Sequence, residues 1–392
     1  MTKQRNDYRH APEKTKTKKS GRRKRYVVLL VVEILAVLLI AAGAFLFFYT
    51  KGIHDTMTEQ VDFSKEDIVV NSEEDVSKHL DTLKEKYTLI MLYGVDSRTD
   101  LDNTLTKDSN ADSEILACID NETGEVKLVS IHRDTFVKTT TGKKNKLTNI
   151  YASYGVQESL GTLNMNLDLN IQQFVTVNWK AVVKAINLLD GLELPLTRSE
   201  VRAVNKFGPH TGKVTGYTYH DLNADDYDYS GENKTAMVYL DGVQAAAYAR
   251  VRSVAKTNDD GVSEHDDIAR ASRQRIVIQA MLEKFKKNFS LSLVDQMKNE
   301  VIPYIATNID YSDLMGMVMD AGKYSIGEQS MFPFKDMYRD SSNQSKAYIY
   351  ADTLTENVQK LHELLFGTTD YQPSATVREL SDFITDYRQN HG

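Results

Sequence analysis

The feature that most constrains this chain is one long apolar run near its N-terminus. The run YVVLLVVEILAVLLIAAGAFLFFY covers residues 26–49 and contains a single charged residue, Glu33. A helix of this length rises about 36 Å, which is enough to cross a hydrocarbon core of about 30 Å with some tilt. A cleaved signal peptide is the competing interpretation, but its apolar region should be only about 7 to 15 residues long. The sequence therefore predicts an uncleaved transmembrane helix.

Charge is distributed unequally on the two sides of this run. Residues 1–25 hold 11 Lys and Arg and two acidic residues, which gives this segment a net charge of +9. Because the whole chain has a net charge of −7, the residues after 25 carry a net charge of −16. The cluster GRRKR at 21–25 favours a cytoplasmic N-terminus, which places the rest of the chain outside the cell. Topology and lipid charge suffice to explain this cluster, so we expect no nucleic-acid partner. Cys118 is the only cysteine, which excludes an intrachain disulfide and favours a core thiol.

Strand and helix patterns alternate after residue 86, which predicts an α/β domain with a layered α-β-α architecture and a central mixed sheet. TLIMLYG (88–94) has the continuous apolar character of a buried strand, and SEILACID and EVKLVSIHRD read as a hairpin. QQFVTVN predicts a further strand, and a helix follows it in NWKAVVKAINLLDGL. The spacing of apolar positions on that helix favours ordinary core over a lipid site: Trp179, Val182, Val183, Ile186 and Leu189.

Arginines gather in two neighbouring segments. In AYARVRS, Arg250 and Arg252 would share one face of an extended chain, where two guanidiniums repel unless an anion lies between them. In DDIARASRQR, helical spacing places Asp267, Arg270 and Gln274 on one face. Arg273 flanks that face and Arg275 turns away from it. A solvated, salt-bridged surface is the alternative for any single arginine, but the combination favours an anion site.

A second charged set lies at the ends of predicted strands, at Asp96, Arg98, Asp112 and Arg133-Asp134. Carboxylates suit a hard cation such as Mg²⁺, which takes one or two of them together with phosphate oxygens and water. Guanidiniums bind phosphate oxygens through two parallel hydrogen bonds. Together the two sets predict a metal-assisted diphosphate site.

Six motifs in this order resemble the LytR-CpsA-Psr family of cell-wall glycopolymer ligases: GVDSR, NADSEILACID, LVSIHRDTFV, KLTNIYASYG, LDGVQAAAYARVR and DIARASRQR. The resemblance implies a membrane-anchored extracellular phosphotransferase of a Gram-positive-type envelope. Such an enzyme takes a teichoic acid or capsular polysaccharide from a polyprenyl diphosphate carrier, whose chain occupies an apolar channel, and joins it to peptidoglycan through a phosphodiester. It further implies Mg²⁺ or Mn²⁺ as cofactor, membrane lipid as a partner, and pyrophosphatase activity as an additional expectation.

The resemblance also implies the roles of individual residues. Asp96 and Asp112 would hold the metal ion. The catalytic set would be Asp96, Asp112, Arg133, Arg250, Arg252, Asp267 and Arg270, and the substrate contacts Arg98, Arg133, Arg250, Arg252, Arg270, Arg273 and Gln274. Asp267 or a metal-released aspartate would accept the proton of the acceptor hydroxyl. The expected organisation is a basic cytoplasmic tail (1–25), the transmembrane helix (26–49), an extracellular stalk or cap (50–85), the catalytic domain (86–367) and a C-terminal extension (368–392).

Two departures from the family pattern leave alternatives open. Asn110 stands where the family commonly has an arginine, so one phosphate contact is absent or is replaced, with Lys107 as a candidate. His132 stands where a proline is usual and is interpreted as an exposed strand-end residue. The second hypothesis is a regulatory protein that binds wall polymer without chemistry. A transcriptional regulator is the third, and both the predicted topology and the negative charge of the domain oppose it.

Overall fold

The structure is a computed structural model that describes residues 61–96, 105–231, 234–257, 263–264, 266–341 and 347–391. These residues belong to one compact unit. The predicted basic tail and transmembrane helix, and Arg98, lie outside the described residues. Among the residues that are described, no helix has both the length and the apolar character needed to cross a membrane.

A six-stranded mixed sheet forms the centre of the unit. Its strands run in the order β11 (Ile305–Thr307), β6 (Gln173–Asn178), β1 (Tyr87–Val95), β2 (Ala111–Asp120), β3 (Glu125–Ile131) and β12 (Ser325–Phe332). β1 pairs antiparallel with β2 and parallel with β6, while β12 pairs parallel with β3. The apolar runs predicted as strands became β1, β2, β3 and β6, whereas β12 was not predicted.

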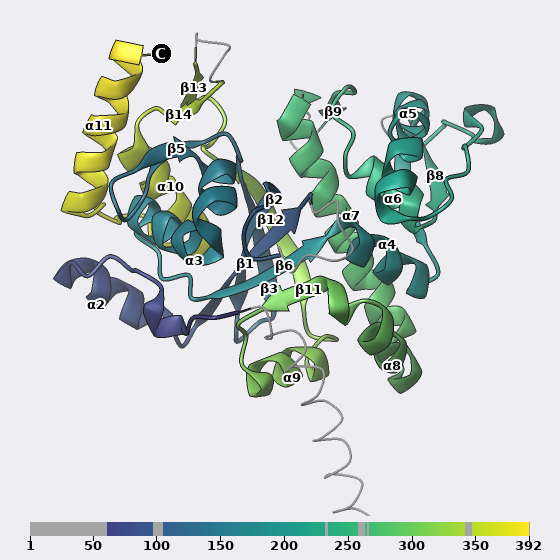
Figure 1. Ribbon diagram of the computed structural model, residues 1–392, viewed down its shortest axis with the longest axis horizontal. Helices are drawn as coiled ribbons and strands as arrows, with labels where there is room; N and C mark the ends of the chain where they lie inside the picture. The colour runs from purple at the N-terminus through teal and green to yellow at the C-terminus, as the bar shows by residue number, and fades with distance from the viewer. Residues whose placement is uncertain are drawn as a thin grey trace, which may run out of the picture. The chain divides into compact units, whose positions relative to one another are not determined.

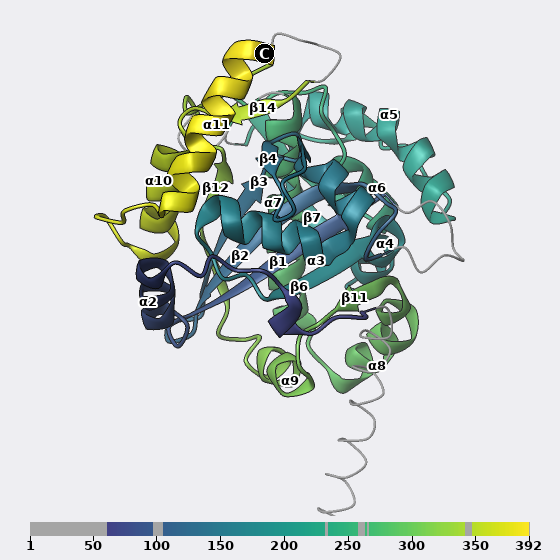
Figure 2. The ribbon, with the colours of Figure 1, turned by 60° about the vertical axis from the view of Figure 1, so that its left-hand side comes forward.

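Helices cover both faces of this sheet (Figures 1 and 2). One face carries α3 (Leu147–Leu167), α10 (Leu354–Phe366) and α11 (Ala375–His391), and the other carries α4 (Trp179–Leu188), α7 (Asp266–Asn288) and α8 (Leu291–Glu300). The alternation of side chains along β2 explains this sandwich: Leu116 and Cys118 join the core beneath α3, while Ile115 and Ala117 pack with Ile278 of α7. The predicted layered domain with a central mixed sheet is confirmed.

The segments on either side of the predicted catalytic domain are part of the same core. Residues 65–83, which include α2 (Glu74–Leu83), and helix α11 contribute Ile68, Val377 and Ile384 to the cluster that contains Met91 of β1. The buried carboxylate of Asp168 joins both segments, because it accepts from Asn71 Nδ2 at 2.7 Å and from the Ser374 amide at 2.8 Å. The predicted boundaries at 85 and 367 therefore do not separate a stalk or an extension from this domain.

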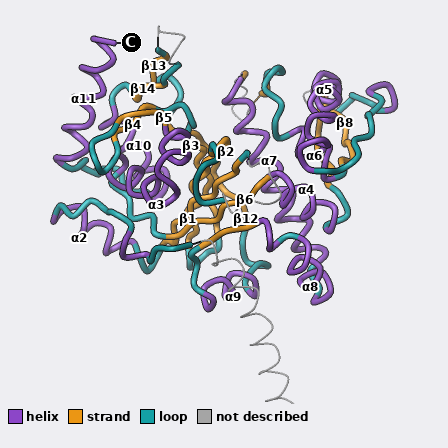
Figure 3. Tube along the Cα trace, in the orientation of Figure 1, coloured by secondary structure: helices purple, strands orange, loops and turns teal. Residues whose placement is uncertain are grey.

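A smaller lobe lies beyond α7 and was not anticipated. The antiparallel pair of β7 (Leu192–Thr197) and β8 (Thr235–Leu240) packs against α5 (Arg198–Thr215) and α6 (Gly242–Tyr248) around a second core that includes Leu194, Val238 and Tyr248. Figure 3 shows this lobe beside α7. Short elements complete the described chain: β4 (Phe136–Lys138), β5 (Lys144–Lys146), β9 (Lys256–Thr257), β10 (Ser263–Glu264), α9 (Tyr311–Met319), β13 (Tyr338–Asp340) and β14 (Ile349–Ala351).

Candidate active site

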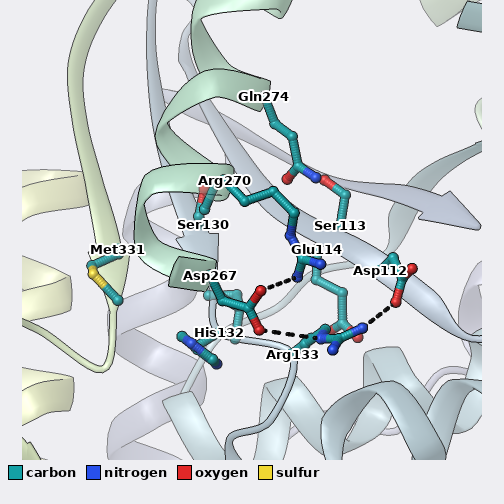
Figure 4. A pocket seen from close by; sticks show the side chains of 12 residues that line it. Asp112, Ser113, Glu114, Ser130, His132, Arg133, Asp267, Arg270, Gln274 and Met331 are labelled. Carbon is teal, nitrogen blue, oxygen red and sulfur yellow. Dashed lines mark hydrogen bonds and ion pairs between the residues drawn. The ribbon is translucent and has the colours of Figure 1, made fainter. Parts of the chain in front are cut away.

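A continuous set of ion pairs joins β2, the end of β3 and the start of α7 (Figure 4). Arg133 donates a hydrogen bond to Asp112, and its Nε lies 3.6 Å from Oδ2 of Asp267. Oδ1 of Asp267 lies 3.1 Å from Nε of Arg252 and 3.3 Å from an amino nitrogen of Arg270. Five side chains expected in the site are thus linked: Asp112, Arg133, Arg252, Asp267 and Arg270.

The topology of the sheet brings these residues together. In the antiparallel β2–β3 hairpin the chain reverses, so the start of β2 and the end of β3 lie at the same edge of the sheet. Asp112 is the second residue of β2 and Arg133 lies two residues beyond β3. Asp267 and Arg270 occupy the beginning of α7, which crosses this edge.

Mutual charge sets the protonation of this group. Burial acts to raise the pKa of Asp267, but Arg270, Arg252 and Arg133 outweigh it and hold the pKa below its ordinary value. Burial lowers the pKa of Arg270 to about 10, against the opposing effect of Asp267. Asp267 is therefore ionised, and the positive charges of its arginines compensate its negative charge. Its pKa would rise, and it would become a stronger base, if these arginines instead paired with another anion.

Glu114 is a site residue that the sequence analysis missed. Its side chain is 2% exposed and lines the same small cavity of about 20 Å³ as Asp112, Arg133 and Arg270. Among the residues that the structure describes, neither carboxyl oxygen has a hydrogen-bond partner, and burial raises the pKa of Glu114 well above its ordinary value. Its position in the strand could have revealed it, because Glu114 lies two and four residues before Leu116 and Cys118 and therefore points to the same core face of β2.

Asp96 follows β1 and lies beside the start of β2, where its amide donates to the carbonyl of Asn110 at 3.2 Å. Asp96 and Asp112 both lie at this edge of the sheet, and carboxylate oxygens are donors that Mg²⁺ prefers. Within the described ranges, no three His, Cys, Asp or Glu side chains are grouped to hold a metal ion by themselves.

Arg250 and Arg252 line a neighbouring cavity of about 170 Å³ together with Arg270, Gln274 and Trp179. The guanidinium of Arg250 lies 5.5 Å from the centre of the Trp179 ring and donates to Thr211 Oγ1 at 3.1 Å. The backbone here is turned and not extended, since the amide of Arg250 bonds to the carbonyl of Ala247. The extended geometry expected for this segment was wrong, although both arginines line one cavity as predicted.

An apolar cavity of about 430 Å³ lies between the sheet and helices α4, α7 and α8. Trp179 and Val182 line it and are only partly buried, so their interpretation as ordinary core was wrong. Val183, Ile186 and Leu189 are buried as predicted, although Leu189 also lines the cavity. Helical spacing could not distinguish a residue that lines a cavity from a residue of the packed core, because both positions are apolar. Gln274 lines this cavity, the small cavity with Asp112 and Arg133, and the cavity with Arg250 and Arg252, so the three cavities adjoin at one side chain.

Arg273 is fully buried, and the expectation that it contacts substrate does not agree with its position. Its guanidinium donates to Glu200 and to the carbonyls of Val251 and Val254, all in the smaller lobe. Arg275 does turn away from the Arg270 face, but it points into the protein, where it donates to Ser130 Oγ at 2.7 Å. Both arginines therefore anchor α7.

The two departures from the family pattern also have defined positions. Asn110 lines a polar cavity whose cations are Arg133 and Lys146, and Lys107 does not line it. His132 is partly buried and lines the small cavity, where its Nδ1 accepts from the amide of Asp134 at 3.3 Å. The expectation of an exposed histidine was wrong, and burial lowers its pKa.

Arginines and carboxylates thus line two cavities that adjoin an apolar cavity. The chain belongs to the LytR_cpsA_psr family, whose sequence model matches residues 46–365. This finding confirms the resemblance carried by the six motifs.

Relatives and solved structures agree with this assignment. The chain is 24% identical to the polyisoprenyl-teichoic acid–peptidoglycan teichoic acid transferase TagU of Enterococcus faecalis over 73% of this chain and 79% of TagU. The structure of TagT bound to LI-WTA matches with a TM-score of 0.53 and 20% identity, over 72% of this chain and 91% of TagT. TagT with bound octaprenyl pyrophosphate lipid matches with a TM-score of 0.50 and 19% identity, over the same shares. At these identities the structures show a shared fold.

Proposed function

We propose that this protein is a membrane-anchored extracellular phosphotransferase that moves a glycopolymer from a polyprenyl diphosphate carrier to peptidoglycan. The polymer is a teichoic acid or a capsular or wall polysaccharide, and the product is a phosphodiester. One observation carries the proposal: Gln274 lines the apolar cavity and also the two cavities that contain Arg270. A lipid chain and its diphosphate head would thus meet at a single point. The named activity of TagU supports the same reaction.

Binding of the carrier follows from this arrangement. The prenyl chain would displace water from the cavity walls formed by α4, α7 and α8, which stabilises the complex through apolar burial. Arg250, Arg252 and Arg270 would donate to the diphosphate oxygens, and each charged hydrogen bond contributes about 1.5–3 kcal/mol. Asp96 and Asp112 would hold Mg²⁺ or Mn²⁺, which supplies further neutralisation of charge at the diphosphate oxygens.

The transfer exchanges one bond for another. The acceptor hydroxyl oxygen forms a bond to the phosphorus that carries the glycopolymer, and the bond from this phosphorus to the bridging oxygen breaks. Polyprenyl monophosphate leaves with the electron pair, and arginines hold the charge that develops on the equatorial oxygens. With water in place of the acceptor, the same displacement gives pyrophosphatase activity.

Asp267, or an aspartate released by the metal ion, would accept the proton of the acceptor hydroxyl. In the free protein three arginines hold the pKa of Asp267 low, which makes Asp267 a weak base. Diphosphate binding would draw Arg252 and Arg270 toward the phosphate oxygens and leave Asp267 with fewer compensating charges. The carboxylate would then become more basic at the moment when an acceptor must be deprotonated.

The location of the protein is part of the proposal. Residues 26–49 supply an apolar segment of spanning length and GRRKR precedes it, a pattern that favours a single-pass protein of the cell membrane with a cytoplasmic N-terminus. Protease treatment of intact cells should degrade the domain after residue 50, and survival of that domain would contradict this topology.

Transfer by purified full-length protein in detergent tests the function. Its substrates are a polyprenyl diphosphate-linked disaccharide and a glycan oligomer from peptidoglycan, and mass spectrometry detects the phosphodiester product. Arg250→Ala and Asp112→Ala should each lower the rate at least about 100-fold, as removal of a group that stabilises transition-state charge does. Chelation of divalent metal should also lower it.

Arg198→Ala is the matched control, because this arginine is exposed in the smaller lobe and pairs with Asp225. Transfer should continue unchanged in this variant. Unaltered transfer by both site variants would reject the enzyme assignment. Metal-dependent carrier binding without turnover in the unmodified protein would instead support a polymer-binding regulatory protein.

A further inference from the structure

A polar cavity of about 390 Å³ lies next to Arg133 and is separate from the cavities that suit the lipid and its diphosphate. Four chain segments form it: the loop before β2, the turn after β3, the start of α3 and the approach to β14. Its lining residues are Asn110, Arg133, Asp134, Asn145, Lys146, Thr148, Asn149 and Tyr348.

Both cations that line this polar cavity are paired with a carboxylate. Lys146 Nζ lies 2.8 Å from Oδ1 of Asp134, and Oδ2 of the same carboxylate lies 3.6 Å from Nε of Arg133. Both cations therefore already have carboxylate partners, and the other lining residues are neutral. Such a surface suits an uncharged polar ligand, in contrast to the cavity that contains Arg250, Arg252 and Arg270.

The neutral groups are held in place and retain bonding capacity. Oδ1 of Asn145 accepts from the Lys146 amide at 2.9 Å and from Asn149 Nδ2 at 3.0 Å. Thr148 is 5% exposed and, among the described residues, its Oγ1 has no hydrogen-bond partner. The amide of Thr148 bonds to the carbonyl of Arg133 at 3.0 Å, which fixes this wall relative to the active site.

One wall of the polar cavity is aromatic. The ring of Tyr348 packs edge-on against Phe136 with 5.0 Å between centroids, and it lies 5.8 Å from the ring of Tyr350. A sugar ring presents both an apolar C–H face and hydroxyl or acetamido groups. A fixed aromatic ring beside asparagine amides complements both parts, because an amide donates and accepts hydrogen bonds.

The position of the polar cavity decides which sugar it suits. Arg133 lines both this cavity and the small cavity with Asp112 and Asp267, whereas the apolar cavity meets that small cavity through Ser113 and Gln274. In phosphoryl transfer the attacking and leaving oxygens lie roughly in line on opposite sides of phosphorus. A leaving group on the apolar side requires that the acceptor approach from the side of Arg133.

We propose that this polar cavity is a binding subsite for a neutral sugar residue of the glycan strand that accepts the polymer. This inference rests on the proposed transferase function. It assigns to Asn149 and Tyr348 a role in positioning the acceptor, apart from the arginines that contact the diphosphate.

Two measurements on full-length protein in detergent test the subsite. The first is direct binding of an uncharged N-acetylglucosamine oligomer to carrier-free protein by calorimetry. Asn149→Ala and Tyr348→Ala should each weaken binding about tenfold, the size expected for one lost hydrogen bond or ring contact. Tyr154→Ala is the matched control, because this tyrosine is exposed on α3 and does not line the cavity.

The second measurement is steady-state transfer with separate titration of the two substrates. The same variants should raise KM for the glycan acceptor about tenfold, with KM for the lipid-linked donor unchanged. A rise in donor KM alone would overturn the inference and assign the cavity to the donor polymer. Unchanged oligomer binding in both variants would also overturn it. The binding measurement does not require turnover, so failure of the transferase function would be recognised separately.

Discussion

Arg273 of α7 donates from Nε to Oε1 of Glu200 at 3.0 Å, and both side chains are almost completely excluded from solvent. The terminal nitrogens of Arg273 donate to the carbonyls of Val251 at 3.1 Å and Val254 at 2.8 Å. These carbonyls belong to the segment that carries Arg250 and Arg252. One buried guanidinium therefore joins the smaller lobe to α7 and fixes the backbone of two candidate phosphate contacts.

Arg273→Met should lower the free energy of unfolding by about 3–5 kcal/mol, because it leaves the Glu200 carboxylate buried without its main partner. Urea denaturation followed by circular dichroism measures this loss. Arg198→Ala removes a half-exposed partner of Asp225 and should cost less than about 1 kcal/mol. Equal losses in the two variants would contradict a structural role for Arg273.

Filling the apolar cavity should discriminate among carriers by chain length. Ala185 is 7% exposed and lines the cavity, so Ala185→Trp places a large ring where the prenyl chain would lie. Exclusion of only two CH₂ groups costs about 1.6 kcal/mol, or about tenfold in Kd for octaprenyl diphosphate. Binding of inorganic diphosphate, which has no chain, should be unchanged if the variant is folded. An unaltered octaprenyl Kd would show that the chain binds elsewhere.

Replacement of the buried acid Glu114 should stabilise the protein increasingly as pH rises. Burial raises the pKa of Glu114 well above 4.5, so the folded state retains a proton that the unfolded state releases above that pH. Folding is therefore opposed by about 1.4 kcal/mol for each pH unit above 4.5, up to the raised pKa. Glu114→Met removes this penalty at similar side-chain volume. Its gain in melting temperature over the unmodified protein should be larger at pH 8 than at pH 5, and a gain independent of pH would contradict the buried neutral acid.

His362 should make the domain labile to acid. Its ring is fully buried, stacks on Tyr371 at 3.7 Å between centroids, and has its pKa lowered by burial to about 3. The unfolded state takes up a proton below about pH 6.5, so this contribution to stability is complete above that pH and is lost as pH falls toward 3. The slope is about 1.4 kcal/mol per pH unit.

His362→Phe preserves the ring stack and should flatten the dependence of unfolding free energy on pH between 6 and 4. His210→Gln is the control, because His210 is exposed at the surface of α5. Identical pH dependence in the His362 variant and the unmodified protein would exclude His362 as the acid-sensitive group.

The local patterns determined several elements and the chemical character of the site. The apolar runs at β1, β2, β3 and β6 predicted strands because continuous apolar segments of that length must be buried. Spacing along α7 placed Asp267, Arg270 and Gln274 together, since the period of a helix is fixed by its hydrogen bonds. The carboxylates and arginines at strand ends predicted an anion site. That prediction, like the one for α7, depended only on the position of each residue relative to its neighbours in sequence.

Other features depended on contacts between distant segments, and only the tertiary structure decided them. Arg270 and Arg273 lie three residues apart on α7, yet one reaches the polar cavities while the other is enclosed by Glu200 and the smaller lobe. Trp179 and Val183 have equally apolar surroundings in sequence, but the former lines a cavity and the latter is core. Sequence spacing fixes the direction of a side chain relative to its own element, whereas the packing of other elements against it decides whether that direction leads to solvent, to a ligand or to the interior.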